Sequence, residues 1–144
     1  MSEFLTLFTR ASKLLREAAD EAMSRHGVRV GQNIILEVLW QHDGLTPGEI
    51  ARRLDLATPT VVNAATRMEE AGLVVRERDS ADGRLVRLYL TPQARSVQGA
   101  IERERAGLER RATGGLTAQE RRDLHAALVK IIDTLSHDRG PPRP

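Results

Sequence analysis

The sequence predicts a mainly α-helical fold that carries one β-hairpin. Three observations predict it: helix starts led by threonine, apolar residues at helical spacing over most of the chain, and one segment where the apolar period changes to two. The chain has 144 residues, of which 40% are hydrophobic and 29% charged, a balance typical of a soluble globular domain. We therefore expect a single domain over residues 1–139 and a disordered tail over 140–144.

The first helices are expected over 3–25 and 31–41, where apolar residues recur at helical spacing. Thr46-Pro47-Gly48-Glu49 then combines a Thr N-cap, a proline at the first helical position and a glutamate at N3, which is a capping box for a short helix over 46–54. Thr58-Pro59 repeats the signal, so we expect a helix over 58–71 with Thr58 as its N-cap and Gly72 just past its end.

After Gly72 the apolar period is two, which predicts strands over Leu73–Arg78 and Arg84–Leu90 around a polar turn. Thr91-Pro92 begins a helix over about 92–111. A second capping box at Thr117 begins the last helix, over about 118–136. A short helix joined to another by a tight turn is a helix-turn-helix, and a hairpin directly after it makes a winged helix. The fold class is thus mainly α, or α+β: a winged helix-turn-helix core over about 31–90 with additional helices on either side.

The helix over 58–71 has two unlike faces. In a helix-turn-helix the second helix enters the major groove of DNA. Asparagine pairs with an adenine edge, arginine with guanine or phosphate, and threonine with phosphate or a thymine methyl. Apolar residues occupy one face and polar ones the other: Val61, Ala65 and Met68 against Thr60, Asn63 and Arg67, with Thr58 at the helix start. The alternative for each polar residue is a solvated surface position.

The hairpin tip contains both acids and arginines. We expect Asp82 to pair with a neighbouring arginine, Arg78 or Arg84, so that Arg84 is directed toward a narrow minor groove, where the negative potential is concentrated. The alternative is an exposed turn whose charges serve solubility alone.

The composition excludes several classes of function. There is no cysteine, so disulfide scaffolds, thiolate zinc sites and thiol redox sensing are excluded. The four histidines lack a tight ligand spacing, and no catalytic constellation or phosphate loop is present, so we expect no metal, no cofactor and no enzyme activity. Few aromatic residues disfavour single-strand binding. No apolar stretch is long enough for a membrane span, and the start lacks a signal-peptide core, so we expect a cytoplasmic protein.

Four segments together resemble the MarR family: Leu45–Ala51, Thr58–Val62, Glu69–Arg76 and Asp79–Arg84, followed by a strand-to-helix join at Val86–Ala94. Ala94 and Arg95 stand where the family often has glycine. The resemblance implies a bacterial transcriptional regulator that binds a palindromic operator as a homodimer. We expect a repressor, and the alternative is an activator. The resemblance implies that 58–71 is the recognition helix and that Arg84 is the minor-groove arginine, supported by Asp82. The family often has a basic residue where this chain has Asn63, which affects the preferred half-site.

The resemblance also implies dimerisation through the helices over about 3–25 and 92–136. Two apolar stripes outside the winged helix also need a partner surface. A second subunit is favoured, and the alternative is that the stripes pack on each other within one subunit. They consist of Phe4, Leu7, Phe8, Leu14 and Leu15 near the start, and Leu124, Leu128, Ile131, Ile132 and Leu135 near the end.

Many members of the family respond to small anionic or aromatic effectors bound beside the winged helix. Trp40 and His42, at the end of the second helix, are the residues we expect near such a site; the alternative is ordinary packing for Trp40 and solvation for His42. A different function remains open, a winged helix that binds a protein partner without specific DNA binding. That function would favour a hydrophobic outer face on the helix over 58–71, whereas the face is Thr, Asn and Arg.

Overall fold

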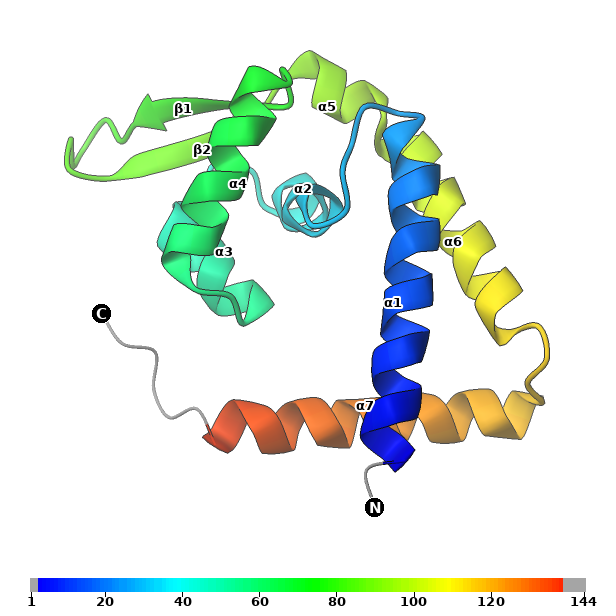
Figure 1. Cartoon of the computed structure of the whole chain (residues 1–144). Helices are drawn as coiled ribbons and strands as arrows, with labels where there is room; N and C mark the ends of the chain where they lie inside the picture. Colours follow the sequence, from blue (N-terminus) through cyan, green and yellow to red (C-terminus); the bar gives the residue numbers. More distant parts are fainter. Residues whose placement is uncertain (1–2, 139–144) are drawn as a thin grey trace. The chain divides into compact units, whose positions relative to one another are not determined.

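The computed structural model describes residues 3–138, which form helices and one hairpin in the order expected (Figure 1). The elements are α1 (Glu3–Ser24), α2 (Gln32–Gln41), α3 (Pro47–Leu54), α4 (Thr58–Glu70), β1 (Val74–Arg78), β2 (Val86–Leu90), α5 (Pro92–Ser96), α6 (Gln98–Thr113) and α7 (Ala118–Asp138). The contacts divide the described chain into two compact units, with the boundary between Leu108 and Glu109, inside α6. The expectation of one domain stays a prediction.

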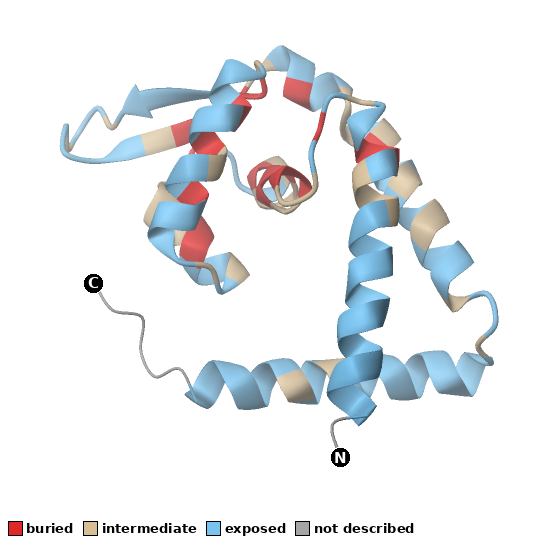
Figure 2. Ribbon diagram, in the orientation of Figure 1, coloured by how far each residue is buried: buried red, intermediate tan, exposed pale blue. Residues whose placement is uncertain are grey.

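The core lies in the first unit, around α2. Figure 2 shows buried residues on α2 and on the faces of α3 and α4 that turn toward it. The fully buried members of this cluster include Ile35, Leu36 and Leu39 from α2, Ile50 from α3, Val61, Ala65 and Met68 from α4, and Leu73, Val74 and Leu88 from the hairpin. Each large aliphatic side chain buried here contributes about 1.5–3 kcal/mol by leaving water. The apolar face of α4 is therefore held by the core.

The helix starts follow the sequence signals, with one correction. The Glu49 amide donates to Thr46 Oγ1 (3.2 Å) and the Thr46 amide donates to Glu49 Oε2 (3.0 Å), which confirms the first capping box. The box at Thr117 is confirmed as well. The N-cap of α4 is Ala57 and not Thr58, because the extended Ala57 already accepts the Thr60 amide at 3.0 Å. Thr58 is instead the first residue of the helix.

The end of α4 turns the chain into the hairpin. The Gly72 amide donates to the Glu69 carbonyl (3.0 Å) and the Leu73 amide to the Met68 carbonyl (2.9 Å), the bond pattern of a Schellman motif. The φ of Gly72 is +77°, a left-handed conformation that glycine adopts without steric cost. The expected position of Gly72 past the helix end is confirmed.

The strands β1 and β2 pair antiparallel, with Arg76 opposite Leu88. The second strand is shorter than predicted and begins at Val86, because Leu85 closes the loop: its amide donates to the Asp82 carbonyl and its carbonyl accepts the Asp79 amide. The other edge of β2 bonds to the segment before α3, where the Leu88 amide donates to the Leu45 carbonyl at 2.9 Å. The hairpin is thus attached to the helix-turn-helix at its base.

One predicted helix is two. The helix expected over 92–111 consists of α5 and α6, which are separated at Val97. The Ser96 hydroxyl donates to the Gln93 carbonyl at 2.7 Å and shares that carbonyl with the Val97 amide, whose bond to it is 3.3 Å long. The tail expected to be disordered, 140–144, lies outside the described residues.

Candidate nucleic-acid interface

The outer face of α4 presents polar side chains that have no partner in the protein. Thr58, Thr60, Asn63 and Arg67 are all exposed. Within residues 3–138, the side chains of Thr60, Asn63 and Arg67 make no hydrogen bond or ion pair, so their donors and acceptors are available to a partner. The burial of Val61, Ala65 and Met68 on the opposite face fixes this orientation. Such a set of groups can read base edges in a major groove.

The tip of the hairpin holds a pre-oriented arginine. Arg84 Nε donates to Asp82 Oδ1 (3.1 Å) and Arg84 Nη2 to Asp82 Oδ2 (3.2 Å), while the Arg84 backbone amide also donates to Asp82. These bonds, chiefly that of the Arg84 side chain, lower the pKa of Asp82 from its ordinary value. The Arg84 side chain is nonetheless 91% exposed. Of the two partners expected for Asp82, the structure selects Arg84; Arg78 is exposed and its side chain makes no hydrogen bond or ion pair within the described residues.

A second carboxylate, Asp79, organises the loop from its other end. Asp79 Oδ2 accepts the backbone amides of Ala81 (3.0 Å) and Asp82 (2.8 Å), and Asp79 Oδ1 accepts Arg87 Nε at 2.7 Å. The bond from Arg87 is the main reason that the pKa of Asp79 is lowered, and it also raises the pKa of Arg87. An aspartate at the start of a turn often bonds the amides two and three residues on, a signal that could have identified Asp79 in the sequence.

Arg87 links this loop to the helix-turn-helix. Its Nη1 donates to the Gly44 carbonyl at 2.9 Å, in the segment between α2 and α3. Gly44 has a φ of +78°, and a Cβ there would lie 2.8 Å from the ring of Tyr89, so this approach of β2 requires glycine. No local pattern in the sequence points to Arg87, because its partners lie 8 and 43 residues away along the chain.

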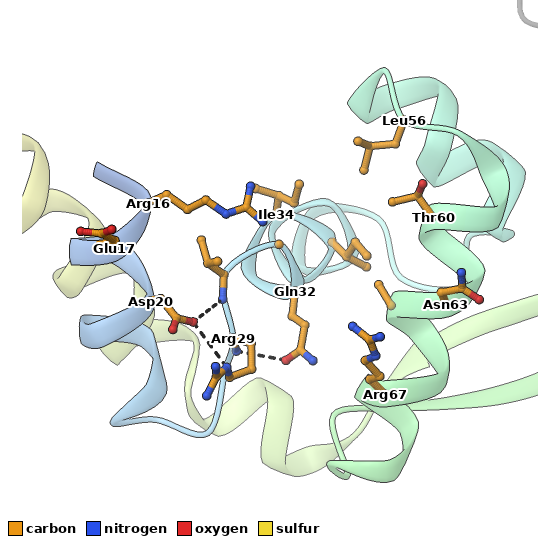
Figure 3. A pocket seen from close by; sticks show the side chains of 14 residues that line it. Arg16, Glu17, Asp20, Arg29, Gln32, Ile34, Leu56, Thr60, Asn63 and Arg67 are labelled. Carbon is orange, nitrogen blue, oxygen red and sulfur yellow. Dashed lines mark hydrogen bonds and ion pairs between the residues drawn. The ribbon is translucent and has the colours of Figure 1, made fainter. Parts of the chain in front are cut away.

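A cavity of about 910 Å³ lies beside α4 within the first unit. Its lining comes from α1, the turn before α2, α2 itself, the turn between α3 and α4, and α4, and Figure 3 shows Arg16, Arg29 and Arg67 around it. Arg29 pairs with Asp20 (Nε–Oδ1 3.4 Å), whereas Arg16 and Arg67 have no carboxylate partner among residues 3–138. Of the two carboxylates in the lining, Asp20 thus pairs with Arg29 and Glu17 pairs with Lys13 (Nζ–Oε1 3.9 Å), so Arg16 and Arg67 are the charged groups available to an anion. Thr60 and Asn63 also line the cavity.

Trp40 and His42 do not line this cavity. Trp40 packs against the core and its Nε1 donates to the Ala94 carbonyl at 3.2 Å; His42 is exposed. A ligand role for either residue stays a prediction. Residues 3–138 contain no cluster of three or more metal-ligating side chains, and no helix in that range could cross a membrane.

Comparison with known proteins places these features in a family. The family model described as MarR family matches residues 26–85. The chain is 34% identical over 120 residues to the HTH-type transcriptional regulator TtmR of Methylorubrum extorquens, a match that covers 82% of this chain and 60% of that protein. It is 29% identical over 126 residues to the HTH-type transcriptional repressor Rv2887 of Mycobacterium tuberculosis, covering 87% of this chain and 90% of the repressor.

A solved structure adds a fold match. The MepR–DNA complex of S. aureus aligns with a TM-score of 0.80 at 26% identity, covering 93% of this chain and 97% of the MepR chain. These relatives are transcriptional regulators and not enzymes. The helix-turn-helix, the hairpin that follows it and the matching relatives together identify the winged helix of this chain, over residues 26–85, as that of a MarR-family transcriptional regulator.

Proposed function

We propose that the protein is a repressor that binds a palindromic operator as a homodimer, with α4 in the major groove and Arg84 in the minor groove of each half-site. The observation that carries the proposal is the unpartnered face of Thr60, Asn63 and Arg67, with Thr58 at its start. The 29% identity to a protein named as a repressor supports repression rather than activation. Since the proposed target is DNA, we also propose a cytoplasmic location.

Exposed apolar side chains support the homodimer. Helix α1 exposes Phe4 and Phe8, whose ring centroids lie 5.7 Å apart, and it buries only Ala22 and Met23. Helix α7 has no buried residue at all. The large side chains left exposed on the two helices are Phe4, Leu5, Leu7, Phe8, Leu14 and Leu15 on α1, and Leu124, Val129, Ile132 and Leu135 on α7. Apolar surface of this extent is typical of an interface with another chain.

The cavity beside α4 supports control by a small anionic aromatic ligand. Arg67 both lines the cavity and belongs to the proposed DNA face. A carboxylate that pairs with Arg67 competes with DNA for the same guanidinium, and an aromatic ring can pack on the apolar lining at Ile34 and Leu56. The proposed ligand therefore releases the operator.

DNA binding is tested by fluorescence anisotropy, with the DNA upstream of the protein's own gene and a scrambled duplex of equal length, across a salt series. We expect nanomolar binding to the upstream DNA, an affinity that falls steeply as the salt concentration rises, and at least ~10³-fold preference for the upstream DNA over the scrambled duplex. If the protein does not prefer the upstream DNA, the next step is to select bound fragments from the whole genome. Absence of enrichment in that selection contradicts the repressor and favours a protein-binding winged helix.

The ligand proposal is tested with benzoate, and with benzyl alcohol as the neutral control. We expect benzoate to weaken operator binding and benzyl alcohol to leave it unchanged. Arg16→Gln removes a cavity arginine that lies outside the DNA face, so it should abolish the benzoate effect and preserve operator affinity. Arg10→Gln, on the same helix but outside the cavity lining, is the matched control. An equal response in all three proteins contradicts this site.

A further inference from the structure

The flank of α4 that lies between its buried face and its DNA face is bonded to β1. Val62, Thr66 and Glu69 follow one another at i, i+4 and i+7, so they form one stripe along the helix. All three are exposed. Val62 and Thr66 each directly precede a residue of the proposed DNA face, Asn63 and Arg67, so bonds to this stripe act next to those two side chains.

A single residue of β1, Arg76, bonds to the whole stripe. Its Nη2 donates to the Val62 carbonyl at 3.3 Å and also to Thr66 Oγ1. Its backbone amide donates to Glu69 Oε2 at 3.2 Å. Arg76 lies in the middle of β1, where it pairs with Leu88 of the core, so its own backbone is fixed by the sheet. The stripe is therefore connected to a fixed point outside the helix.

Thr66 is suited to receive this bond. Its hydroxyl proton is donated to the Val62 carbonyl at 3.1 Å, which leaves the oxygen lone pairs directed outward for Arg76. Val62 O, Thr66 Oγ1 and the Arg76 guanidinium thus form a closed set of hydrogen bonds on the helix surface. Both bonds come from the same nitrogen, Nη2, which lies one bond farther along the side chain than the Nζ of a lysine would, so a lysine at this position falls short of the two acceptors.

We propose that Arg76 is a positioning residue for sequence recognition: it fixes the rotation of α4 about its own axis and so sets where Asn63 and Arg67 meet the bases. The core fixes one side of the helix, and Arg76 fixes the adjacent side. Hydrogen bonds to base edges tolerate little displacement, whereas contacts to phosphates tolerate more. Arg76 therefore acts on the discrimination between DNA sequences more than on overall affinity. The inference rests on the proposed function of α4.

The competing role is a direct phosphate contact. Arg76 is exposed and its guanidinium forms no ion pair with a carboxylate among the described residues, so its charge is available to DNA. The positioning role and the phosphate-contact role predict different effects of the substitution Arg76→Lys. A lysine keeps the charge and the phosphate contact but cannot reproduce the paired bonds to Val62 and Thr66.

The test measures binding to the operator duplex and to a scrambled duplex, across a salt series, for Arg76→Lys, Thr66→Val, Thr66→Ser and the double variant Arg76→Lys/Thr66→Val. We expect Arg76→Lys and Thr66→Val each to weaken operator binding about tenfold, with scrambled binding and salt slope unchanged. Thr66→Ser keeps the hydroxyl and should bind like the wild type. Because both changes remove one interaction, the double variant should be no weaker than the single ones.

The control is Arg78→Lys, two residues along the same face of β1 and without contacts in the described chain. Thermal unfolding of each variant separates loss of fold from loss of recognition, and Thr66→Val preserves the shape of the side chain if Arg76→Lys proves unstable. Wild-type operator binding by Arg76→Lys, or a salt slope lowered by about 1 in Arg76→Ala, overturns the proposal in favour of a phosphate contact. If the wild type itself does not discriminate between the two duplexes, the proposed function fails instead.

Discussion

Arg84 and Asp82 form a small pre-organised unit at the hairpin tip. The carboxylate holds the guanidinium by two hydrogen bonds, yet the arginine remains almost fully exposed. Asp79 orders the same loop through the amides of Ala81 and Asp82. A side chain that is already oriented loses less conformational entropy when it binds, so these two acids favour an arginine contact rather than oppose it.

The first prediction concerns Arg84. Arg84→Ala should weaken operator binding by about 1–3 kcal/mol, because the minor-groove contact is lost, and should leave the oligomeric state unchanged. Fluorescence anisotropy and sedimentation velocity measure the two effects. Arg78→Ala, which removes an equally charged but uncontacted residue of the same hairpin, is the control. Equal losses from both variants would mean that the hairpin contributes only non-specific positive charge and no defined minor-groove contact.

Asn63 is expected to govern base preference. Asn63→Ala should change the ranking of operator variants more than it changes affinity for scrambled DNA, because its amide can pair with an adenine edge. A binding selection from a randomised half-site measures the ranking. A loss of equal size on scrambled DNA would assign Asn63 to a phosphate contact.

The lowered pKa of Asp79 predicts an effect of pH. The folded state favours the ionised carboxylate, so its stabilisation is present above the ordinary pKa of 3.8 and is lost as the pH falls through the lower folded pKa. Asp79→Asn should therefore reduce stability at neutral pH, and the difference from the wild type should shrink below pH 3.8. Urea unfolding at several pH values measures it. Glu77→Gln is the control, because Glu77 lies on β1 and its exposed side chain makes no hydrogen bond or ion pair within the described residues.

At the scale of the elements, α4 is held in place from three sides. The core holds the apolar face of α4, the Schellman motif sets the direction in which the chain leaves it, and Arg76 bonds its flank. The hairpin is anchored in turn through Arg87 to the Gly44 carbonyl and through β2 to Leu45. The two proposed DNA contacts, α4 and the hairpin tip, therefore belong to one connected scaffold.

The capping box of α3 provides a prediction at this scale. Thr46→Ala removes the acceptor of the Glu49 amide and should lower the free energy of unfolding by about 1 kcal/mol. Thr46→Ser keeps the acceptor and should be close to the wild type. Urea unfolding followed by Trp40 fluorescence measures both. No difference between the alanine and serine variants would mean that the box adds nothing to stability.

At the scale of the whole molecule, the winged helix has a core of its own, whereas α7 and most of α1 have none. Helix α7 buries no residue, and α1 is exposed from Glu3 to Glu17. An exposed helix gains little stability by itself, because most helical stability in proteins comes from packing of an apolar face. This imbalance is consistent with helices that are completed by a second subunit.

The proposed dimer is tested by Leu7→Glu and Ile132→Glu, which place a charge on the exposed apolar faces. Each should convert the dimer to monomer in sedimentation experiments, because a buried unpaired carboxylate costs several kcal/mol. Operator affinity should fall with it, since a monomer contacts one half-site. Val75→Glu, at an exposed apolar position on β1, should leave the dimer intact. Variants that remain dimeric would place the interface elsewhere.

The sequence alone determined the helix starts, the two faces of α4 and the place of the hairpin. These features depend on local signals: Thr46 and Glu49 satisfy each other three residues apart, Gly72 supplies a left-handed φ, and helical periodicity separates Val61 from Asn63. The polar outer face of α4 and the exposed Arg84 were predicted in the same way. The misplaced N-cap at Thr58 and the undivided helix over 92–111 show the limit, because one competing hydrogen bond moves a boundary by a residue or ends a helix.

Only the tertiary structure decided which residues support the proposed site. Arg87 meets Gly44 across 43 residues, and Arg76 meets Val62 across 14. The cavity arises where α1, α2 and α4 approach one another, so no single segment encodes it and it excludes Trp40 and His42. The physical reason is that these contacts depend on the packing distance between elements, which a pattern along one chain segment does not contain. Local sequence rules therefore identify the side chains presented to a partner, while the fold determines what holds them in position.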